Sequence, residues 1–396
     1  MDIRTALTTN PVAAPALAEL AAQLGVGADG PRPDFIALHC AEGLAEAFGR
    51  LAMDALGCAG ALHGGTTCLG VMTDKGVATA GGTGSGAFAI FDPEGSYGTG
   101  AAELGDDPRG AARSAVLAAL RQADREGESP SLVWLTTAPG AEEAVLDGVR
   151  DIVGDKTPVV GGSSADNTIA GNWAQFSGDR LLRNGVVASV LFPSGGVSTA
   201  FQGGYTPSPR SGVVTAAEGR RLISIDGEPA ATVYARWTDN AVLPALTTPR
   251  SILADSTLNP LGRVSDNIAG VPMYLLIHPA TSNPDGSIEL FADVQVGDRL
   301  WQMEGTQKSL IERAGQVARA SLEADLAPAG ALIVYCAGCM LAQPHRMDAV
   351  ADSLREALND TPFLCVFTFG EQGYVTPAQS RHGNLMISST VFGQEP

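Results

Sequence analysis

Short apolar runs and helical apolar spacing alternate along this chain. In residues 331–373, an apolar run at 332–336 precedes a stretch whose apolar residues repeat every three or four positions. A second apolar run at 363–369 follows Thr361-Pro362. Short runs rich in β-branched and aromatic residues are typical of buried strands, and a proline ends a helix. The pattern therefore predicts a strand–helix–strand unit.

This unit recurs along the chain. Residues 132–166 repeat it, with Thr157-Pro158 after the helical stretch, and residues 35–68 form a looser copy. Apolar runs at 184–192 and 384–392 resemble matching closing strands. Internal repetition constrains the architecture more than any single element does. The sequence therefore predicts an α/β fold of two related mixed-sheet domains, with internal β-α-β repeats, placed pseudo-symmetrically with a cleft between them.

Changes in composition set the predicted domain boundaries. Residues 1–34 are expected to form an N-terminal helix, with Leu17, Leu20 and Leu24 on its apolar face, and a lead-in rich in glycine and proline at 25–33. Three prolines at 193–211 mark the next boundary. The first main domain is therefore residues 35–200 and the second is residues 201–396.

Composition excludes several classes of function. The 396-residue chain is 45% hydrophobic and 17% charged, as expected of a globular protein. Its 43 acidic and 25 basic residues give a net charge of -18, which argues against binding nucleic acid or an anionic membrane. No apolar run approaches the roughly 20 residues of a membrane helix. Six cysteines in so long a chain are no disulfide framework, which favours a reducing cytoplasm.

Candidate ligand-binding groups follow the predicted strands. Paired glycines let backbone N–H groups face an anion, and adjacent Ser or Thr hydroxyls add donors. Glu371 and Asp166 could hold an ammonium group, so the set suits a small zwitterion such as an amino acid. The alternative is that each Gly-Gly-Ser/Thr segment only makes a tight turn. The candidate residues are His63, Gly64, Gly65, Thr66, Thr67, Cys68, Gly161, Gly162, Ser163, Ser164, Asp166, Cys336, Gly370, Glu371 and Gln372.

Cysteine and histidine leave two further interpretations open. Cys336 and Cys339 form a C-x-x-C with Cys365 on the neighbouring predicted strand, so these thiols and His63 are candidate metal ligands, and His63 is a candidate haem ligand. A nucleophilic Cys68 or Cys336, paired with His63 or His382, would instead indicate an enzyme. The chain has no second C-x-x-C, and a free cysteine that ends an apolar strand is often only a small hydrophobe.

Several separated motifs resemble one family. The N-terminal FIST domain is similar to the segments LHGGTTCLGVMTDKG, TPVVGGSSADN and NGVVASVLF. The C-terminal FIST domain is similar to RRLISIDGEPAATVYARW, IHPATSNPDGSIELFADVQVGDRLWQMEGT and the final segments CAGC, FTFGEQG and HGNLMISSTVF. The resemblance covers residues 35–392. It implies a sensory domain of signal transduction that binds small ligands such as amino acids. Some stand-alone members are haem proteins that sense nitric oxide and regulate a histidine kinase.

These observations lead to one main expectation with alternatives. The chain is expected to be a non-enzymatic, cytoplasmic sensor that binds a small polar, amino-acid-like metabolite at the inter-domain cleft and signals to a separate partner protein. The first alternative is a haem- or metal-binding sensor of the nitric-oxide type that regulates a histidine kinase. The second is a cysteine-dependent enzyme, and the third is a scaffold for protein interactions.

Overall fold

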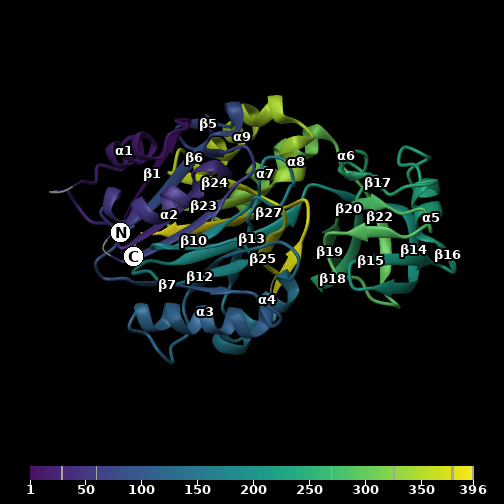
Figure 1. The fold of residues 1–396 in the computed structure, drawn as a ribbon, viewed down its shortest axis with the longest axis horizontal. Helices are drawn as coiled ribbons and strands as arrows, with labels where there is room; N and C mark the ends of the chain where they lie inside the picture. The colour runs from purple at the N-terminus through teal and green to yellow at the C-terminus, as the bar shows by residue number, and fades with distance from the viewer. Residues whose placement is uncertain (28–29, 59, 269, 324–325, 376–378, 395–396) are drawn as a thin grey trace.

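The computed structural model describes residues 1–27, 30–58, 60–268, 270–323, 326–375 and 379–394 (Figure 1). Two residues of the predicted lead-in, 28 and 29, lie outside the described residues. The predicted mixed α/β class with internal β-α-β repeats is confirmed, and the repeat occurs three times.

Three six-stranded sheets share one strand order. The first sheet runs β1 (Asp2–Thr8), β6 (Ser85–Phe91), β2 (Phe35–Cys40), β3 (Ala61–Thr66), β10 (Gln175–Ser177), β11 (Arg180–Leu182). The second runs β7 (Ser96–Glu103), β12 (Gly185–Phe192), β8 (Leu132–Thr137), β9 (Val159–Ser163), β25 (Glu371–Val375), β26 (Gln379–Gly383). The third runs β13 (Val197–Gly203), β27 (Met386–Gly393), β23 (Pro328–Cys336), β24 (Phe363–Thr368), β4 (Val71–Thr73), β5 (Gly76–Ala78). In each sheet the β-α-β strands pair in parallel, and their other neighbours are antiparallel.

The repeats exchange hairpins in a cycle. The hairpin β4–β5 follows β3 in the chain but joins the third sheet, β10–β11 follows β9 but joins the first, and β25–β26 follows β24 but joins the second. Each sheet is therefore completed by another repeat. The predicted boundary between residues 200 and 201 falls inside β13, which pairs with β27 near the C-terminus.

Helices cover one face of each sheet, and the other faces meet in a shared core. Apolar residues of α1 (Ala13–Leu24) and α2 (Ala45–Ala55) pack on the first sheet, those of α3 (Pro108–Gln122) and α4 (Glu142–Val153) on the second, and those of α7 (Gln307–Ala320) and α9 (Met347–Leu358) on the third. Short helical segments lie at η1 (Glu42–Leu44), η2 (Ala80–Gly82), α8 (Ala337–Leu341) and η3 (Pro344–Arg346). The inner core contains Phe35, Trp134 and Leu332, one from each sheet. Strands buried on both faces explain the continuous apolar runs in the sequence.

Local sequence signals set most of these elements. All five apolar positions of the predicted 347–358 helix are buried in α9, which ends at Asn359 in the left-handed conformation. Helix α3 begins with Pro108 after an Asp107 cap, and α7 begins with a Thr306–Ser309 capping box. The predicted N-terminal helix is α1, but the edge strand β1 before it was not predicted. In the part of the chain that the structure describes, no helix is long and apolar enough to cross a membrane.

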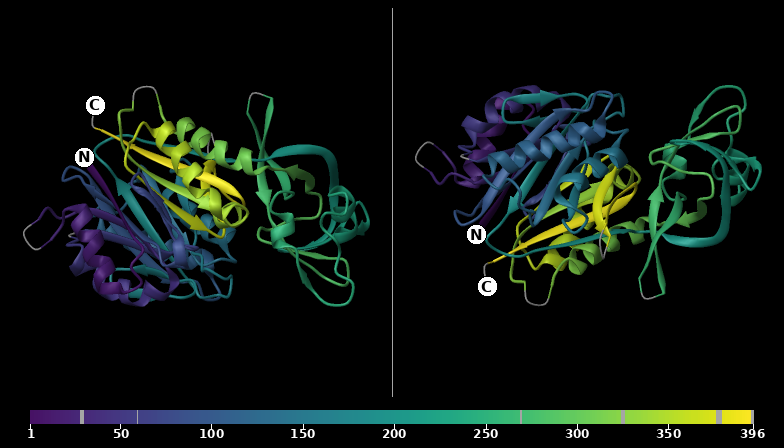
Figure 2. Two further views of the ribbon diagram at one scale, coloured as in Figure 1. Left: turned by 90° about the horizontal axis from the view of Figure 1, so that it is seen from above. Right: turned by 90° about the horizontal axis from the view of Figure 1, so that it is seen from below.

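A separate β domain, residues 204–306, is inserted between β13 and α7. Its nine-stranded sheet runs β17 (Arg250–Ser251), β20 (Pro279–Ser282), β21 (Ile288–Leu290), β15 (Arg221–Ile225), β14 (Thr206–Glu218), β22 (Arg299–Glu304), β18 (Leu261–Ile268), β19 (Val271–Ile277), with β16 (Glu228–Pro229) paired to β15. It also holds α5 (Ala230–Trp237) and α6 (Leu253–Ser256), and it has its own core. Figures 1 and 2 show it beside the three sheets, which we call the α/β body, and away from both termini.

Candidate functional site

The glycine-rich ends of the three second strands meet. Backbone hydrogen bonds join Ala165 N to Thr66 O (3.1 Å), Phe369 N to Ser163 O (3.1 Å) and Cys68 N to Phe367 O (3.1 Å). The carboxyl ends of β3, β9 and β24 therefore lie together, although these strands are about 100 to 300 residues apart in the sequence. Sequence repetition places the candidate residues in one region.

This region is tightly closed. All fifteen candidate ligand residues are buried. A Cβ added at Gly64 would overlap the ring of Phe176, and one at Gly65 would lie 2.7 Å from Cγ2 of Thr136. Gly64 and Gly65 lie inside β3 and not in a tight turn, and they permit close packing between strands and side chains. The prediction that the fifteen residues bind a ligand stays a prediction.

The candidate carboxylates already have partners. Asp166 accepts backbone hydrogen bonds from Thr168, Ala170 and Asn172, and so holds the loop that follows it. Glu371 accepts from the Thr368 hydroxyl (2.9 Å) and from the backbone N–H of Met386 (3.0 Å). Burial raises the pKa of Glu371 well above 4.5, which favours its neutral form. Neither group is arranged to hold an ammonium ion.

His63 belongs to a buried hydrogen-bond network with three hydroxyl groups. Its Nδ1 lies 2.8 Å from Oγ of Ser189 and its Nε2 lies 2.7 Å from Oγ1 of Thr136, while Ser189 also contacts Thr99. Burial, and then the neighbouring His39, lower the pKa of His63 well below 6.5. Since both ring nitrogens are engaged and the side chain is fully buried, His63 does not fit the role of a haem ligand.

His39 and Trp134 were missed by the sequence analysis. Their rings and that of His63 lie 6.3 to 6.5 Å apart at the polar end of the inner core. Among the described residues, both ring nitrogens of His39 and Nε1 of Trp134 lack a hydrogen-bond partner. Burial lowers the pKa of His39 to about 4. The sequence signal that could have identified His39 is its position as a histidine in the otherwise apolar strand β2.

The cysteines are free, buried thiols. Burial raises the pKa of Cys68 to about 12, and it raises the pKa of Cys336 well above 9. Thiolate is the reactive and metal-binding form, so these shifts disfavour both chemistries. In the described residues Cys336, Cys339 and Cys365 do not form a group with three ligand atoms in reach of one ion. Cys336 lines a cavity of about 30 Å³ with His278 and Phe291 of the β domain.

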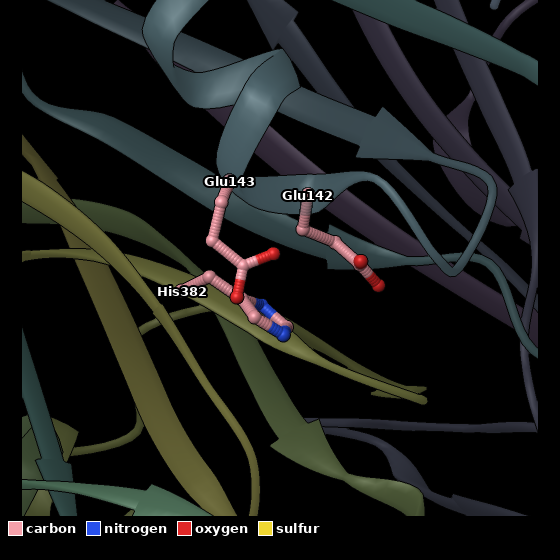
Figure 3. A group of neighbouring side chains, drawn as sticks. All are labelled: Glu142, Glu143 and His382. Carbon is pink, nitrogen blue, oxygen red and sulfur yellow. The ribbon is translucent and has the colours of Figure 1, made fainter. Parts of the chain in front are cut away.

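A cluster of charged side chains joins the body to the β domain. Glu142 and Glu143 open α4, and His382 lies opposite them on β26 (Figure 3). Nη2 of Arg220, in the turn between β14 and β15, lies 2.7 Å from each carboxylate. We call Glu142, Glu143, Arg220 and His382 the junction cluster. Arg220 and Glu142 are 78 positions apart in the sequence, so no local motif predicts their ion pair.

Two predicted residues support the junction cluster. The Ser163 hydroxyl donates to Oε1 of Glu142 (2.7 Å), and the Gln372 amide lies 3.4 Å from Nδ1 of His382. Burial alone would raise the pKa of Glu142, but His382 and Arg220 lower it to about 2. Atoms of Glu142, Glu143 and His382 lie within 4.8 Å of one another, as a metal ion requires, but the guanidinium of Arg220 neutralises the carboxylates here. The cluster therefore joins the body to the β domain through ion pairs.

A groove of about 470 Å³ lies elsewhere along the same junction. None of the fifteen predicted residues is among the described residues that line it. Its polar side chains include Arg313 of α7 and Gln202 of β13, and Nη1 of Arg313 donates to Oε1 of Gln202 (3.2 Å). The described lining is Phe201, Gln202, Gly203, Tyr205, Pro207, Ser265, Val271, Pro272, Met273, Tyr274, Leu275, Leu276, Met303, Arg313, Val375 and Met386. The signal available in the sequence was an arginine among the helically spaced apolar residues Leu310, Ala314 and Val317.

Two domain profiles cover most of the sequence. Residues 34–228 match the FIST N domain, and residues 230–374 match the FIST C domain. The chain belongs to the FIST family. FIST domains are associated with sensing in signal transduction. The FIST N match contains the first two repeats and runs through β13 to β15, and the FIST C match begins with α5 of the β domain.

Other comparisons place this FIST protein far from characterised chains. No curated protein matches it. A crystal structure of cyanuric acid hydrolase from A. caulinodans has 10% sequence identity and a TM-score of 0.37, with 99% of this chain and 98% of that chain covered. PurLQS from Thermotoga maritima has 9% identity and a TM-score of 0.24, with 76% and 72% covered. At these values neither likeness bears on function.

Proposed function

We propose that this FIST protein is a non-enzymatic, cytoplasmic sensor of a small, polar, amino-acid-like metabolite. The ligand binds in the groove between the α/β body and the β domain. The observation that carries the proposal is that both parts line this groove: Gln202 and Arg313 come from the body, while Met273 and Tyr274 come from the β domain. A ligand that touches both can favour one arrangement of the two over another.

Some contacts across the junction are of a kind that allows the β domain to move relative to the α/β body. Outside the groove the described contacts include polar ones: the junction cluster at one edge, and Asn384, which donates its backbone N–H to Leu276 O (3.0 Å) and accepts from His278 N (3.1 Å). Polar contacts of this kind are common where domains move relative to each other. A separate protein, such as a histidine kinase, would read the resulting change.

The buried thiols favour a sensor over a cysteine-dependent enzyme. A nucleophilic cysteine needs a low pKa and access to substrate. Cys68 and Cys336 have raised pKa values and are at most 3% exposed.

Ligand-induced stabilisation tests the proposal. We would measure the melting temperature of the protein with a panel of amino acids and related metabolites. Val271 is 61% exposed at the groove, so Val271→Trp should block the groove without changing the core. Val296 is 65% exposed and is not part of the lining, so Val296→Trp is the matched control.

A ligand is expected to raise the melting temperature of the wild type and of Val296→Trp, and to have little effect on Val271→Trp. If no member of the panel stabilises the wild type, or if Val271→Trp responds as the wild type does, the groove is not the sensing site.

A further inference from the structure

Among the described residues of this strongly acidic protein, Arg313 is a cation without a carboxylate partner. The side chain is half-buried, and among the described residues it makes no ion pair; its recorded partner is the neutral amide of Gln202. The chain holds 43 acidic and 25 basic residues, so an acidic partner is not scarce. The guanidinium remains available for an anion that comes from outside the chain.

The described lining of the groove carries no negative charge to offset Arg313. No Asp or Glu is among its described lining residues. Because apolar walls exclude water and lower the local dielectric constant, the positive charge acts more strongly there than on an open surface. The groove should therefore attract anions and should give no counter-charge to an ammonium group.

The geometry around Arg313 fits a planar carboxylate. A guanidinium can donate two parallel hydrogen bonds to one carboxylate. Gln202 uses Oε1 to accept from Arg313, which leaves its amide N–H groups free to donate to the same ligand oxygen atoms. The two side chains come from α7 and β13, which are both packed elements of the body.

Most of the remaining lining of the groove is apolar, although Ser265, Tyr205 and Tyr274 also carry hydroxyl groups. Phe201, Met273, Leu276, Val375 and Met386 supply aromatic, aliphatic and thioether surface. A volume of about 470 Å³ lies within the ordinary range for small-molecule sites. The ligand should therefore carry its charge at one end and an apolar body at the other.

We infer that the groove binds a small carboxylic acid with an apolar body, whose carboxylate is held by Arg313 and Gln202. This inference rests on the proposed function and narrows its ligand from an amino-acid-like metabolite to a carboxylate whose other end is apolar. Recognition of an ammonium group is not required.

Isothermal titration tests the inference with defined probes. We would use 3-phenylpropionate and 4-methylpentanoate, together with their neutral amides, which keep the shape and remove the charge. The carboxylates are expected to bind the wild type, and each amide should bind about tenfold more weakly, as fits the loss of a charge-assisted hydrogen bond.

Two variants assign that preference to one side chain. Arg313→Gln should bind acid and amide alike. Arg319→Gln, an exposed arginine on the same helix, should keep the wild-type preference. Far-UV circular dichroism checks that both variants fold, and the comparison of acid with amide on the wild type needs no variant at all.

Three results would overturn the inference: amides that bind as tightly as acids, an Arg313→Gln protein that still prefers acids, or no binding of any acid in the series. Val271→Trp separates the two levels of the argument. After any of these results, a Val271→Trp protein that no longer binds the probes bound by the wild type shows that the groove is a ligand site as proposed and that only the carboxylate assignment fails. If probes bind and it blocks none of them, the proposed function fails as well.

Discussion

Removal of the Arg220 guanidinium should weaken the protein strongly at neutral pH. In Arg220→Met the side chain keeps much of its length, but Glu142 stays buried, with its side chain only 2% exposed, and loses a charged partner 2.7 Å away. Breaking a buried ion pair by removing one partner typically costs about 3 to 5 kcal/mol. Because the Arg220 side chain is 19% exposed, we expect the lower end of this range.

The lowered pKa of Glu142 reflects the combined effect of its neighbours, chiefly His382 and Arg220, against the cost of burial. A fall from 4.5 to about 2 corresponds to about 3 kcal/mol of stability, at about 1.4 kcal/mol per pKa unit. Since the pKa is lowered in the folded state, this stability is present above pH 4.5 and is lost as the pH falls toward 2. Arg220→Met removes one of the two charged groups that lower the pKa of Glu142, so this pKa should rise, while the lowering by His382 remains. The carboxyl group of the variant would then be neutral at a higher pH, and the variant would regain part of its deficit.

Urea unfolding at pH 7 and pH 4 measures both effects. The free energy of unfolding of Arg220→Met should be about 3 kcal/mol below that of the wild type at pH 7, and the difference should shrink at pH 4. The control is Arg221→Met, because Arg221 pairs with Asp285 at the surface and such pairs contribute about 1 kcal/mol or less. A deficit at pH 7 no larger than that of Arg221→Met, or a deficit unchanged at pH 4, would refute the reasoning.

Three further expectations concern the α/β body. Gly64→Ala should lower the free energy of unfolding by about 1 to 3 kcal/mol because its methyl group would meet Phe176, while Gly43→Ala, which faces open space, should change it little in the same urea titration. Burial lowers the pKa of His39 from 6.5 to about 4, so the unfolded state binds more protons and stability should fall by up to about 3 kcal/mol between pH 6.5 and 4; His39→Phe should flatten this part of the pH profile, and an unchanged slope would contradict the assignment. Cys68, with its pKa near 12, should resist iodoacetamide at pH 8 in the folded protein and react once urea unfolds it, as mass spectrometry can show.

The sequence predicted the units of this fold better than their connections. The β-α-β units were evident because each strand is buried on both faces and each helix presents one apolar stripe, as in α9. A pattern shows that a segment forms a strand, but it does not show which sheet receives that strand. The two strands of the hairpin β4–β5 are adjacent in sequence, yet their partner strand β24 lies almost 300 residues away. The exchange of hairpins was therefore beyond local patterns.

The same limit applies to the site. Convergence of Thr66 and Ser163 followed from repetition, because equivalent strand ends meet at equivalent places. The close packing around these residues could not be predicted, because the ring of Phe176 that fills the space at Gly64 comes from the hairpin of another repeat. Arg313 lies on α7, and its lack of an acidic partner among the described residues depends on which residues the fold brings near.

The cyclic exchange of hairpins sets an order of events during synthesis. When the ribosome has made the first two repeats, β4–β5 has no third sheet to join, and the edge of β9 lacks β25. A nascent chain at that stage exposes unpaired strand edges, which attract other chains until translation supplies the remaining repeat. An isolated FIST N segment, expressed alone, would keep these open edges permanently and would be expected to aggregate or to need a chaperone.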